Sequence, residues 1–361
     1  MRAAKTLCLS LCLSFATSSA NGFTVLGEEE AALLQTALTT SADAFVLPAY
    51  EAQQAAAADL NASLGAYCVG EGAIEPAQEA FVDLFVAWQR ASIVGLGPIM
   101  DEEGPLRVQL WPDSKGHSQR ATRTAIRAGD PALLEPGALV GRSIALTNLT
   151  ALEGLLFRDL AAQSYACDLA RAIAAFQADL ATDLVAAWSP GSGYRAVFDS
   201  AGDGNETYPT VDALVREFLA GSIVYTDRLR KFKLARGLGD APGDARPERT
   251  EAVRSGAGLA SLEESFRTLA AFYDTPGGLF DAATAMGGTK NYSALADVAT
   301  SVADSLAALD RSLEEVVAAD GDAAADLRRY VQLVTFHEAY LKVGFLNSIG
   351  LSAGFTSADG D

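Results

Sequence analysis

The sequence contains very little histidine, and little cysteine once its first twenty residues are set aside. Its 361 residues include two histidines, His117 and His337, and only Cys68 and Cys167 lie beyond the N-terminal segment. Two histidines so far apart cannot build the usual histidine-rich catalytic zinc site. His337 and Glu338 supply only the first two residues of a His-Glu-x-x-His motif. The composition therefore argues against a zinc peptidase of the usual kind.

Other catalytic signatures are also missing. The chain has no Gly-x-Ser-x-Gly nucleophile elbow, no phosphate-binding Walker loop and no dinucleotide-binding glycine pattern. Aromatic residues make up only 8% of the chain, whereas half of its residues are hydrophobic and alanine dominates among them. This balance favours helices that pack closely through small side chains.

Positive charge is scarce. The formal net charge is −19, which excludes nucleic acid and anionic lipid as natural partners because the chain repels both. Such acidity could attract cations, but the need for a soluble surface explains the negative charge more simply. Beyond the N-terminus no apolar run is long enough to span a membrane, so no transmembrane segment is expected.

The first twenty residues have the pattern of a secretion signal. Arg2 and Lys5 form a basic start, and a short apolar run from Leu7 to Phe15 follows. Small residues at 18–20 predict cleavage before Asn21, which removes two positive charges and changes the net charge from −19 to −21. We therefore expect a soluble mature protein in the periplasm.

A lipoprotein is the alternative to simple cleavage. Leu9-Ser10-Leu11-Cys12 is similar to a lipoprotein box, in which the cysteine receives the lipid. Leu11 is bulky where a small residue is expected, so the sequence favours cleavage without lipidation.

Periodic apolar residues predict an all-α protein built as two helical bundles. Residues 199–209 are rich in Gly, Asp and Asn, so we place a domain boundary there, between residues 21–200 and 201–361. Pro48 should kink or split the first long helix. Helices are expected at about 28–67, 76–96, 118–127, 145–157, 163–188, 211–234, 259–273, 291–318 and 323–346.

Cys68 and Cys167 are expected to form a disulfide. Both lie at the edges of predicted helices, and an exported compartment permits the bond. The alternative is a pair of free, buried thiols.

Glu153 lies on the apolar face of a short predicted helix. Leu149, Leu152 and Leu156 share that face, and Glu153 points out of its middle. A carboxylate there needs a cation, a metal or several hydrogen-bond donors, which makes Glu153 a candidate site residue. The alternative is that Glu153 pairs with a core arginine or caps a neighbouring helix.

The irregular segment 101–145 is the expected source of partners for Glu153. Long loops in compact domains often shape sites, and this one carries Arg107, Asp113 and Arg142. For each of these side chains, helix capping or a surface ion pair is the alternative role.

Several blocks resemble the imelysin-like proteins of bacterial envelopes, whose signature is Gly-x-His-x-x-Glu on a helix. That signature aligns with residues 148–153, where Glu153 matches while Thr150 replaces the histidine and Asn148 the glycine. Further similar blocks are Trp111-Pro112-Asp113, Glu251-Ala252-Val253-Arg254-Ser255 and the Gly-Phe-x-x-x-Asp-Gly-Asp ending at residues 354–361.

The resemblance implies an imelysin-like pair of helical bundles, of the four-helix up-and-down kind, and a periplasmic binding protein linked to iron uptake. Iron(III) or another oxygen-ligated cation would then bind Glu153, Asp113 and Asp359, and envelope iron-uptake proteins would be partners. A polar ligand site at the interface of the two halves would comprise Glu153, Thr150, Asn148, Asp113, Trp111, Arg107, Arg142, Glu251, Arg254 and Ser255.

Three alternatives remain open. The first is a cleft that binds a peptide or glycan without a metal, and the second is a structural envelope protein whose site has decayed. The third is a metallopeptidase, which the family name suggests and which the replacement of histidine by Thr150 argues against.

Overall fold

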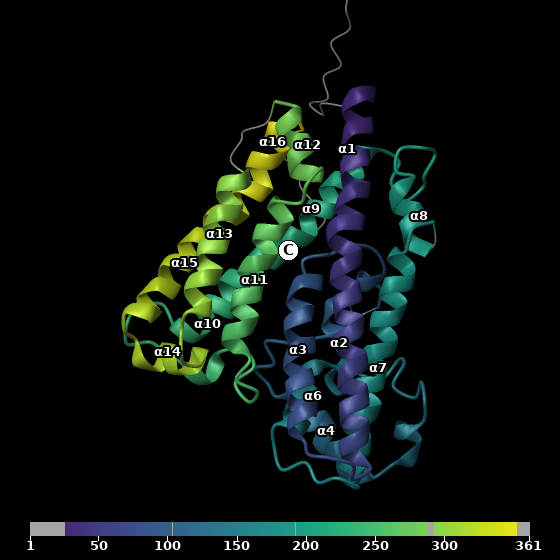
Figure 1. Cartoon of the computed structure of the whole chain (residues 1–361), viewed down its shortest axis with the longest axis vertical. Coiled ribbons are helices and arrows are strands. Elements are labelled where there is room, and N and C mark those ends of the chain that lie inside the picture. Colours follow the sequence, from purple (N-terminus) through teal and green to yellow (C-terminus); the bar gives the residue numbers. More distant parts are fainter. Residues whose placement is uncertain (1–25, 103, 192, 288–291, 352–361) are drawn as a thin grey trace, which may run out of the picture.

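The computed structural model describes residues 26–102, 104–191, 193–287 and 292–351. Within these ranges all regular structure is helical, which confirms the predicted all-α class (Figure 1). The predicted signal sequence and the whole ending at residues 354–361, which includes Asp359, lie outside the described residues. None of the described helices combines the length and hydrophobicity needed to cross a bilayer.

The α-helices are α1 (Glu28–Ser41), α2 (Leu47–Cys68), α3 (Glu75–Ala91), α4 (His117–Ala128), α5 (Ile144–Thr147), α6 (Leu149–Leu156), α7 (Tyr165–Trp188), α8 (Gly193–Asp199), α9 (Val211–Arg228), α10 (Arg236–Leu238), α11 (Gly258–Tyr273), α12 (Leu279–Ala285), α13 (Tyr292–Ala307), α14 (Leu313–Ala319), α15 (Asp322–Ala339) and α16 (Leu346–Ser348). Short 3-10 or π segments are η1 (Ala42–Val46), η2 (Gly97–Met100), η3 (Gly104–Arg107), η4 (Pro131–Leu134), η5 (Leu229–Ala235), η6 (Pro247–Arg249) and η7 (Tyr340–Phe345).

In the first half of the chain α2 packs between α3 and α7, while α4 and α6 lie beside the lower ends of these helices (Figure 1). The end of α2 and the first turn of α7 are joined by the disulfide Cys68–Cys167, with Cα atoms 5.6 Å apart. The predicted bridge is therefore confirmed.

The second half is framed by α9, α11, α13 and α15. Helix α11 packs along α13 and also contacts α3, while α1 contacts α9 and α12 at the upper end (Figure 1). The buried apolar side chains of both halves form one continuous cluster. The division at residues 199–209 corresponds to the connection between α8 and α9 and stays a prediction.

Several predicted helices are divided in the structure, among them the one expected at 145–157, which separates into α5 and α6 at Asn148. The chain passes through the π segment η1 directly before Pro48, as expected for a helix that proline interrupts. The prediction of a single helix at 291–318 is wrong, because this segment forms two helices, α13 and α14. Ser312 and Glu315 form a capping box that starts the second piece, a signal that periodicity alone does not reveal.

The two halves touch through glycine at one crossing. A Cβ atom on Gly221 of α9 would lie 2.4 Å from the backbone nitrogen of Gly95, in the turn after α3, and 2.9 Å from the carbonyl oxygen of Ile93. Only glycine permits this backbone approach. The backbones of the two halves are therefore in direct contact at this crossing.

Candidate functional site

Helix α6 holds the family motif, and Asn148 is its N-cap. The buried Asn148 side chain accepts hydrogen bonds through Oδ1 from the backbone nitrogens of Thr150 (2.8 Å) and Ala151 (3.1 Å). These bonds satisfy donors that every helix start leaves free. Asn148 thus starts the helix that presents Glu153, and it does not line the cavity beside it.

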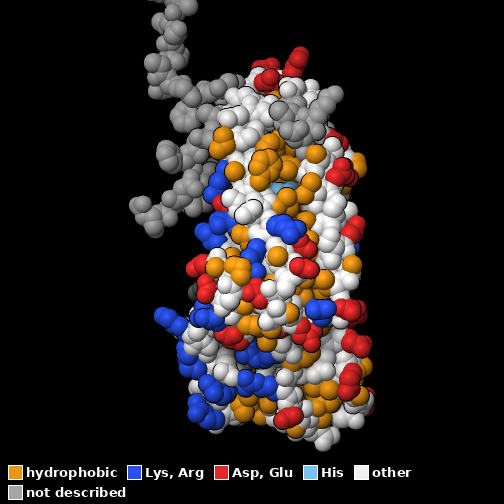
Figure 2. Space-filling model, turned by 90° about the vertical axis from the view of Figure 1, so that its left-hand side faces the viewer, with side chains coloured by type: hydrophobic (Ala, Val, Ile, Leu, Met, Phe, Trp, Pro, Cys, Tyr) orange, Lys and Arg blue, Asp and Glu red, His pale blue; other side chains and the backbone are white. Residues whose placement is uncertain are grey.

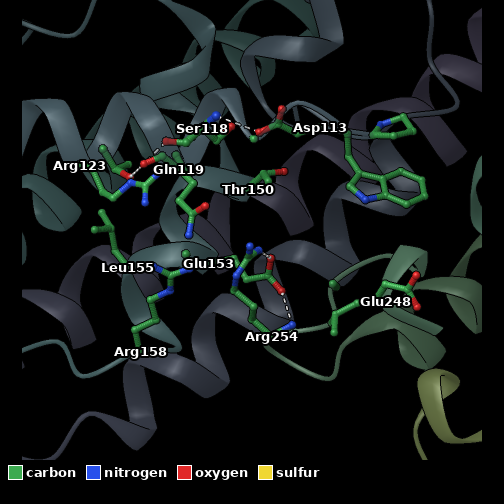
Figure 3. Close-up of a pocket in the computed structure, with 18 of the residues that line it drawn as sticks. Asp113, Ser118, Gln119, Arg123, Thr150, Glu153, Leu155, Arg158, Glu248 and Arg254 are labelled. Atoms are coloured by element: carbon green, nitrogen blue, oxygen red, sulfur yellow. Dashed lines mark hydrogen bonds and ion pairs between the residues drawn. The ribbon is translucent and has the colours of Figure 1, made fainter. Parts of the chain in front are cut away.

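Glu153 is buried and bound to the second half of the chain. Its Oε1 accepts hydrogen bonds from the backbone nitrogens of Arg254 (3.2 Å) and Ser255 (3.1 Å) and from Ser255 Oγ (3.0 Å). Arg254 Nη1 lies 3.4 Å from Oε2 (Figure 3). Glu153 therefore has the counter-charge and donors that its position on an apolar face requires.

The prediction that Arg107 or Arg142 supplies the counter-charge of Glu153 is wrong. Arg107 donates to the carbonyl oxygen of Pro98 and lies 3.6 Å from Glu102, while Arg142 Nε donates to the carbonyl oxygen of Ala138. Both arginines satisfy carbonyl groups of their own loop segment, away from the cavity. Arg254 takes the role instead because its loop from the second half covers α6.

Asp113 and Thr150 also have partners within the protein. Asp113 caps α4, since Oδ1 accepts from the backbone nitrogen of His117 (2.7 Å) and Oδ2 from that of Ser118 (2.8 Å). Thr150 Oγ1 donates to the carbonyl oxygen of Leu110 (3.0 Å), which joins α6 to the loop that carries Trp111.

A cavity of about 820 Å³ lies where these elements meet. In the first half it is bounded by the loop before α4 and by α4 and α6. In the second half it is bounded by Arg236 and by the segment 248–254 (Figure 3). Its charged side chains are Asp113, Arg123, Glu153, Arg158, Asp159, Arg236, Glu248, Arg249 and Arg254. Of the residues expected from the sequence, the structure brings together Trp111, Asp113, Thr150, Glu153 and Arg254 around it.

The sequence prediction missed the cavity arginines Arg123, Arg158, Arg236 and Arg249. A signal for the first of them was present, because the predicted helix at 118–127 carries Arg120, Arg123 and Arg127 at spacings of three and four. A basic stripe of this kind is unusual in so acidic a chain.

Glu251 lies behind the cavity wall in a separate buried network. Its Oε2 accepts from Lys233 Nζ (2.8 Å) and Ser261 Oγ (2.6 Å), and its Oε1 from Gln109 Nε2 (2.7 Å). Lys233 Nζ also donates to Gln89 Oε1 (2.5 Å). Burial raises the pKa of Glu251, but the ammonium group and these donors outweigh it and hold the pKa below its usual value.

Glu251 and Ser255 give one loop two attachments to the first half. Gln109 reaches Glu251 from one side, and Glu153 accepts from Arg254 and Ser255 on the other. The loop that closes the cavity is therefore held at both ends by carboxylate hydrogen bonds.

The cavity residues do not fit a bare metal ion. Within the described ranges no group of three or more His, Cys, Asp or Glu side chains is placed to hold one. The oxygens of Glu153 and Asp113 face N–H donors and a guanidinium group, so a cation would meet positive potential there. Glu153 and Asp113 therefore do not support the predicted metal-ligand set of Glu153, Asp113 and Asp359, because their oxygens already accept hydrogen bonds from the protein.

Replacing Glu153 with alanine should destabilise the protein by about 2 kcal/mol, because three donors of residues 254 and 255 lose their acceptor. The cost stays moderate since the Arg254 side chain is 40% exposed and can be hydrated. Urea unfolding measures the change. Ser255→Ala, which removes one of these donors, should cost clearly less, and equal losses in both variants would contradict the hydrogen-bonding role.

His337 should make the fold sensitive to acid. It is buried, with Nδ1 3.3 Å from the Tyr273 hydroxyl, and burial lowers its pKa to about 4. The unfolded chain, with a pKa near 6.5, binds the proton more readily, so stability is complete above pH 6.5 and falls by about 3 kcal/mol as the pH drops to 4. Urea unfolding at pH 7 and pH 5 should show a loss that shrinks in His337→Leu. The exposed His117 provides the control, and an equal effect of His117→Leu would contradict this origin.

A family model identifies the class of protein. The Imelysin family (Peptidase_M75) matches residues 46–338, so the chain belongs to the imelysin family. A search of curated proteins finds no match.

Two solved structures share the fold. The imelysin-like protein from Psychrobacter arcticum superposes with a TM-score of 0.72 at 18% identity, covering 90% of this chain and 98% of its own. The putative iron-regulated protein A precursor from Parabacteroides distasonis gives a TM-score of 0.71 at 13% identity, covering 87% and 95%.

Proposed function

We propose that the chain is an exported, periplasmic binding protein of the imelysin family that takes a small ligand in the cavity beside Glu153 and serves iron handling. The carrying observation is that Glu153 from the first half accepts hydrogen bonds from Arg254 and Ser255 of the second half, and that Glu153 and Arg254 line one cavity. Ligand sites are commonly concave and lie between structural units.

Two observations support the proposed link to iron, namely the description of a structural neighbour and the signal-like N-terminal sequence. One structural neighbour is described as a putative iron-regulated protein A precursor. The signal-like residues 1–20 of this chain are consistent with export. Since the cavity does not fit a bare ion, we propose that iron is met here as a complex with an organic ligand.

A peptidase role receives less support. The family histidine is replaced by Thr150, whose hydroxyl is already bonded to the carbonyl oxygen of Leu110. Neither a nucleophile paired with a base nor a zinc-binding set occurs among the described residues that line the cavity. We therefore propose binding without cleavage.

Gly154 offers a direct test of the cavity. It follows Glu153 on α6 and lines the cavity, and a Cβ atom there meets no other atom within 4 Å. Phenylalanine at this position should fill the cavity without disturbing the core, while alanine should leave room for ligand and favour the helix. The binding signal is the fluorescence of Trp111, which lines the same cavity.

The mature protein would be titrated with iron(III) citrate, a mixed tripeptide pool and a neutral oligosaccharide. We expect one probe to bind the parent and Gly154→Ala, and to lose at least tenfold in affinity for Gly154→Phe. Gly65→Phe is the matched control, since Gly65 is also helical with open space at Cβ and lies outside the cavity. Failure of every probe, or binding unchanged in Gly154→Phe, would contradict the proposed function.

A further inference from the structure

The cavity gathers arginine side chains from several separate elements. Arg123 comes from α4, Arg158 follows α6, Arg236 begins α10, Arg249 ends η6, and Arg254 lies in the loop bound to Glu153. In Figure 3 Arg123 and Arg158 lie on the same side of the cavity, with Arg254 nearer its middle. Such convergence runs against the charge of the chain, which is −19.

Most of these guanidinium groups are not neutralised by the protein. Arg254 pairs with Glu153, whereas Arg123, Arg158, Arg236 and Arg249 make no ion pair with any residue in the described ranges. Arg158 instead faces the amide of Gln119, and Arg236 Nη2 donates to Ser114 Oγ (2.9 Å). The hydrogen bond to Ser114 holds the guanidinium group of Arg236 at the cavity and leaves its charge available.

The cavity carboxylates offset this charge only in part. Five arginines face four carboxylates, and two of the four are committed, Glu153 to the 254–255 loop and Asp113 to the start of α4. Figure 2 shows Lys and Arg side chains gathered in the lower part of the molecule, at the height of α4 and α6 in Figure 1, while Asp and Glu follow its right-hand edge. The field at the cavity therefore favours an anion.

We propose that the ligand of this cavity is a small, multiply charged oxyanion, such as a polycarboxylate that is free or carries iron(III). The inference rests on the proposed function and names the chemical class of its ligand. The planar guanidinium group matches carboxylate and phosphate oxygens with two parallel hydrogen bonds, and several such groups around about 820 Å³ suit a compact anion. An anionic iron complex would explain how a protein proposed to handle iron can have a cavity that disfavours a bare cation.

Arg123→Gln and Arg158→Gln test the inference by calorimetry on the mature protein. The probes are citrate, iron(III) citrate, inorganic phosphate and a neutral oligosaccharide. At least one anion should bind the parent, lose about tenfold or more in affinity in each variant, and weaken as salt increases. Both arginines are exposed, so the variants should fold, which their melting curves verify.

Arg127→Gln is the matched control, because Arg127 is an exposed arginine of the same helix α4 that does not line the cavity. Its anion affinity should stay within twofold of the parent. Binding of the iron complex but not of free citrate would support the iron-loaded anion, equal binding would support the organic anion itself, and phosphate alone would support a phosphate ligand.

Three outcomes would overturn the inference. They are anion binding that is unchanged in Arg123→Gln and Arg158→Gln, an equal loss in Arg127→Gln, and the absence of anion binding. A neutral probe that binds the parent and is blocked by Gly154→Phe would retain the proposed function while rejecting an anionic ligand. Absence of binding by all probes would remove both.

Discussion

Replacing Glu251 with alanine should destabilise the fold by about 3–5 kcal/mol, because it leaves the ammonium group of Lys233 buried without a counter-charge. Lys233 would retain only the neutral acceptors Gln89 and Ser261. The Nε2 group of Gln109, which donates to Glu251 from the first half, would lose its acceptor as well. Urea unfolding monitored by circular dichroism measures this loss.

The matched experiment removes both charges. In the double variant Lys233→Met with Glu251→Leu, neither charge of the buried pair remains, so most of the lost stability should return. Asp326→Ala, which breaks the exposed ion pair with Arg329, serves as the surface control and should change stability by less than about 0.5 kcal/mol. If Glu251→Ala resembled that control, the network would not hold the two halves together as inferred.

Removing the disulfide should be the other large perturbation. Cys68 and Cys167 are 99 residues apart, and closing a loop of that length restricts the unfolded chain enough to stabilise the fold by about 4.7 kcal/mol in the chain-entropy model. The double variant Cys68→Ala with Cys167→Ala should therefore melt at a lower temperature than the oxidised parent and similarly to the reduced parent.

Intact-mass measurement after alkylation provides the control. The unreduced parent should take up no alkylating reagent at these positions, and the reduced protein should take up two equivalents. Two reactive thiols in the unreduced mature protein, together with a nearly harmless Cys68→Ala, would contradict the bridge.

The helical class followed from the sequence because apolar residues recur at helical spacing and strand signals are weak. The disulfide was predictable since only two cysteines lie beyond the first twenty residues. The division between α13 and α14 was not, because Ser312 and Glu315 act through hydrogen bonds that leave the apolar period intact. The close approach of Gly95 and Gly221 was equally hidden, since their separation in the chain gives no hint of contact.

At the candidate site the helical wheel located Glu153, while Arg254 and Ser255 entered the predicted site only through the family resemblance and were not predicted as its partners. The helical wheel identified a carboxylate on an apolar face, and that property depends only on local spacing. Arg254 lies 101 residues away, so its approach depends on how the second half packs on α6. Arg107 and Arg142 lie closer to Glu153 in the sequence, but their guanidinium groups donate to nearby backbone carbonyl oxygens instead. Among the missed cavity arginines, Arg236 and Arg249 also come from the second half, whereas Arg123 belongs to a basic stripe on α4 that the sequence already showed.

The most direct measurement is a crystal structure of the mature protein grown with iron(III) citrate, with anomalous data collected at the iron edge. We expect an iron peak inside the cavity, with citrate oxygens within hydrogen-bonding distance of Arg123 or Arg158 and with Glu153 still bound to Ser255. An iron ion coordinated directly by Glu153 and Asp113, or iron bound only outside the cavity, would contradict the central claim.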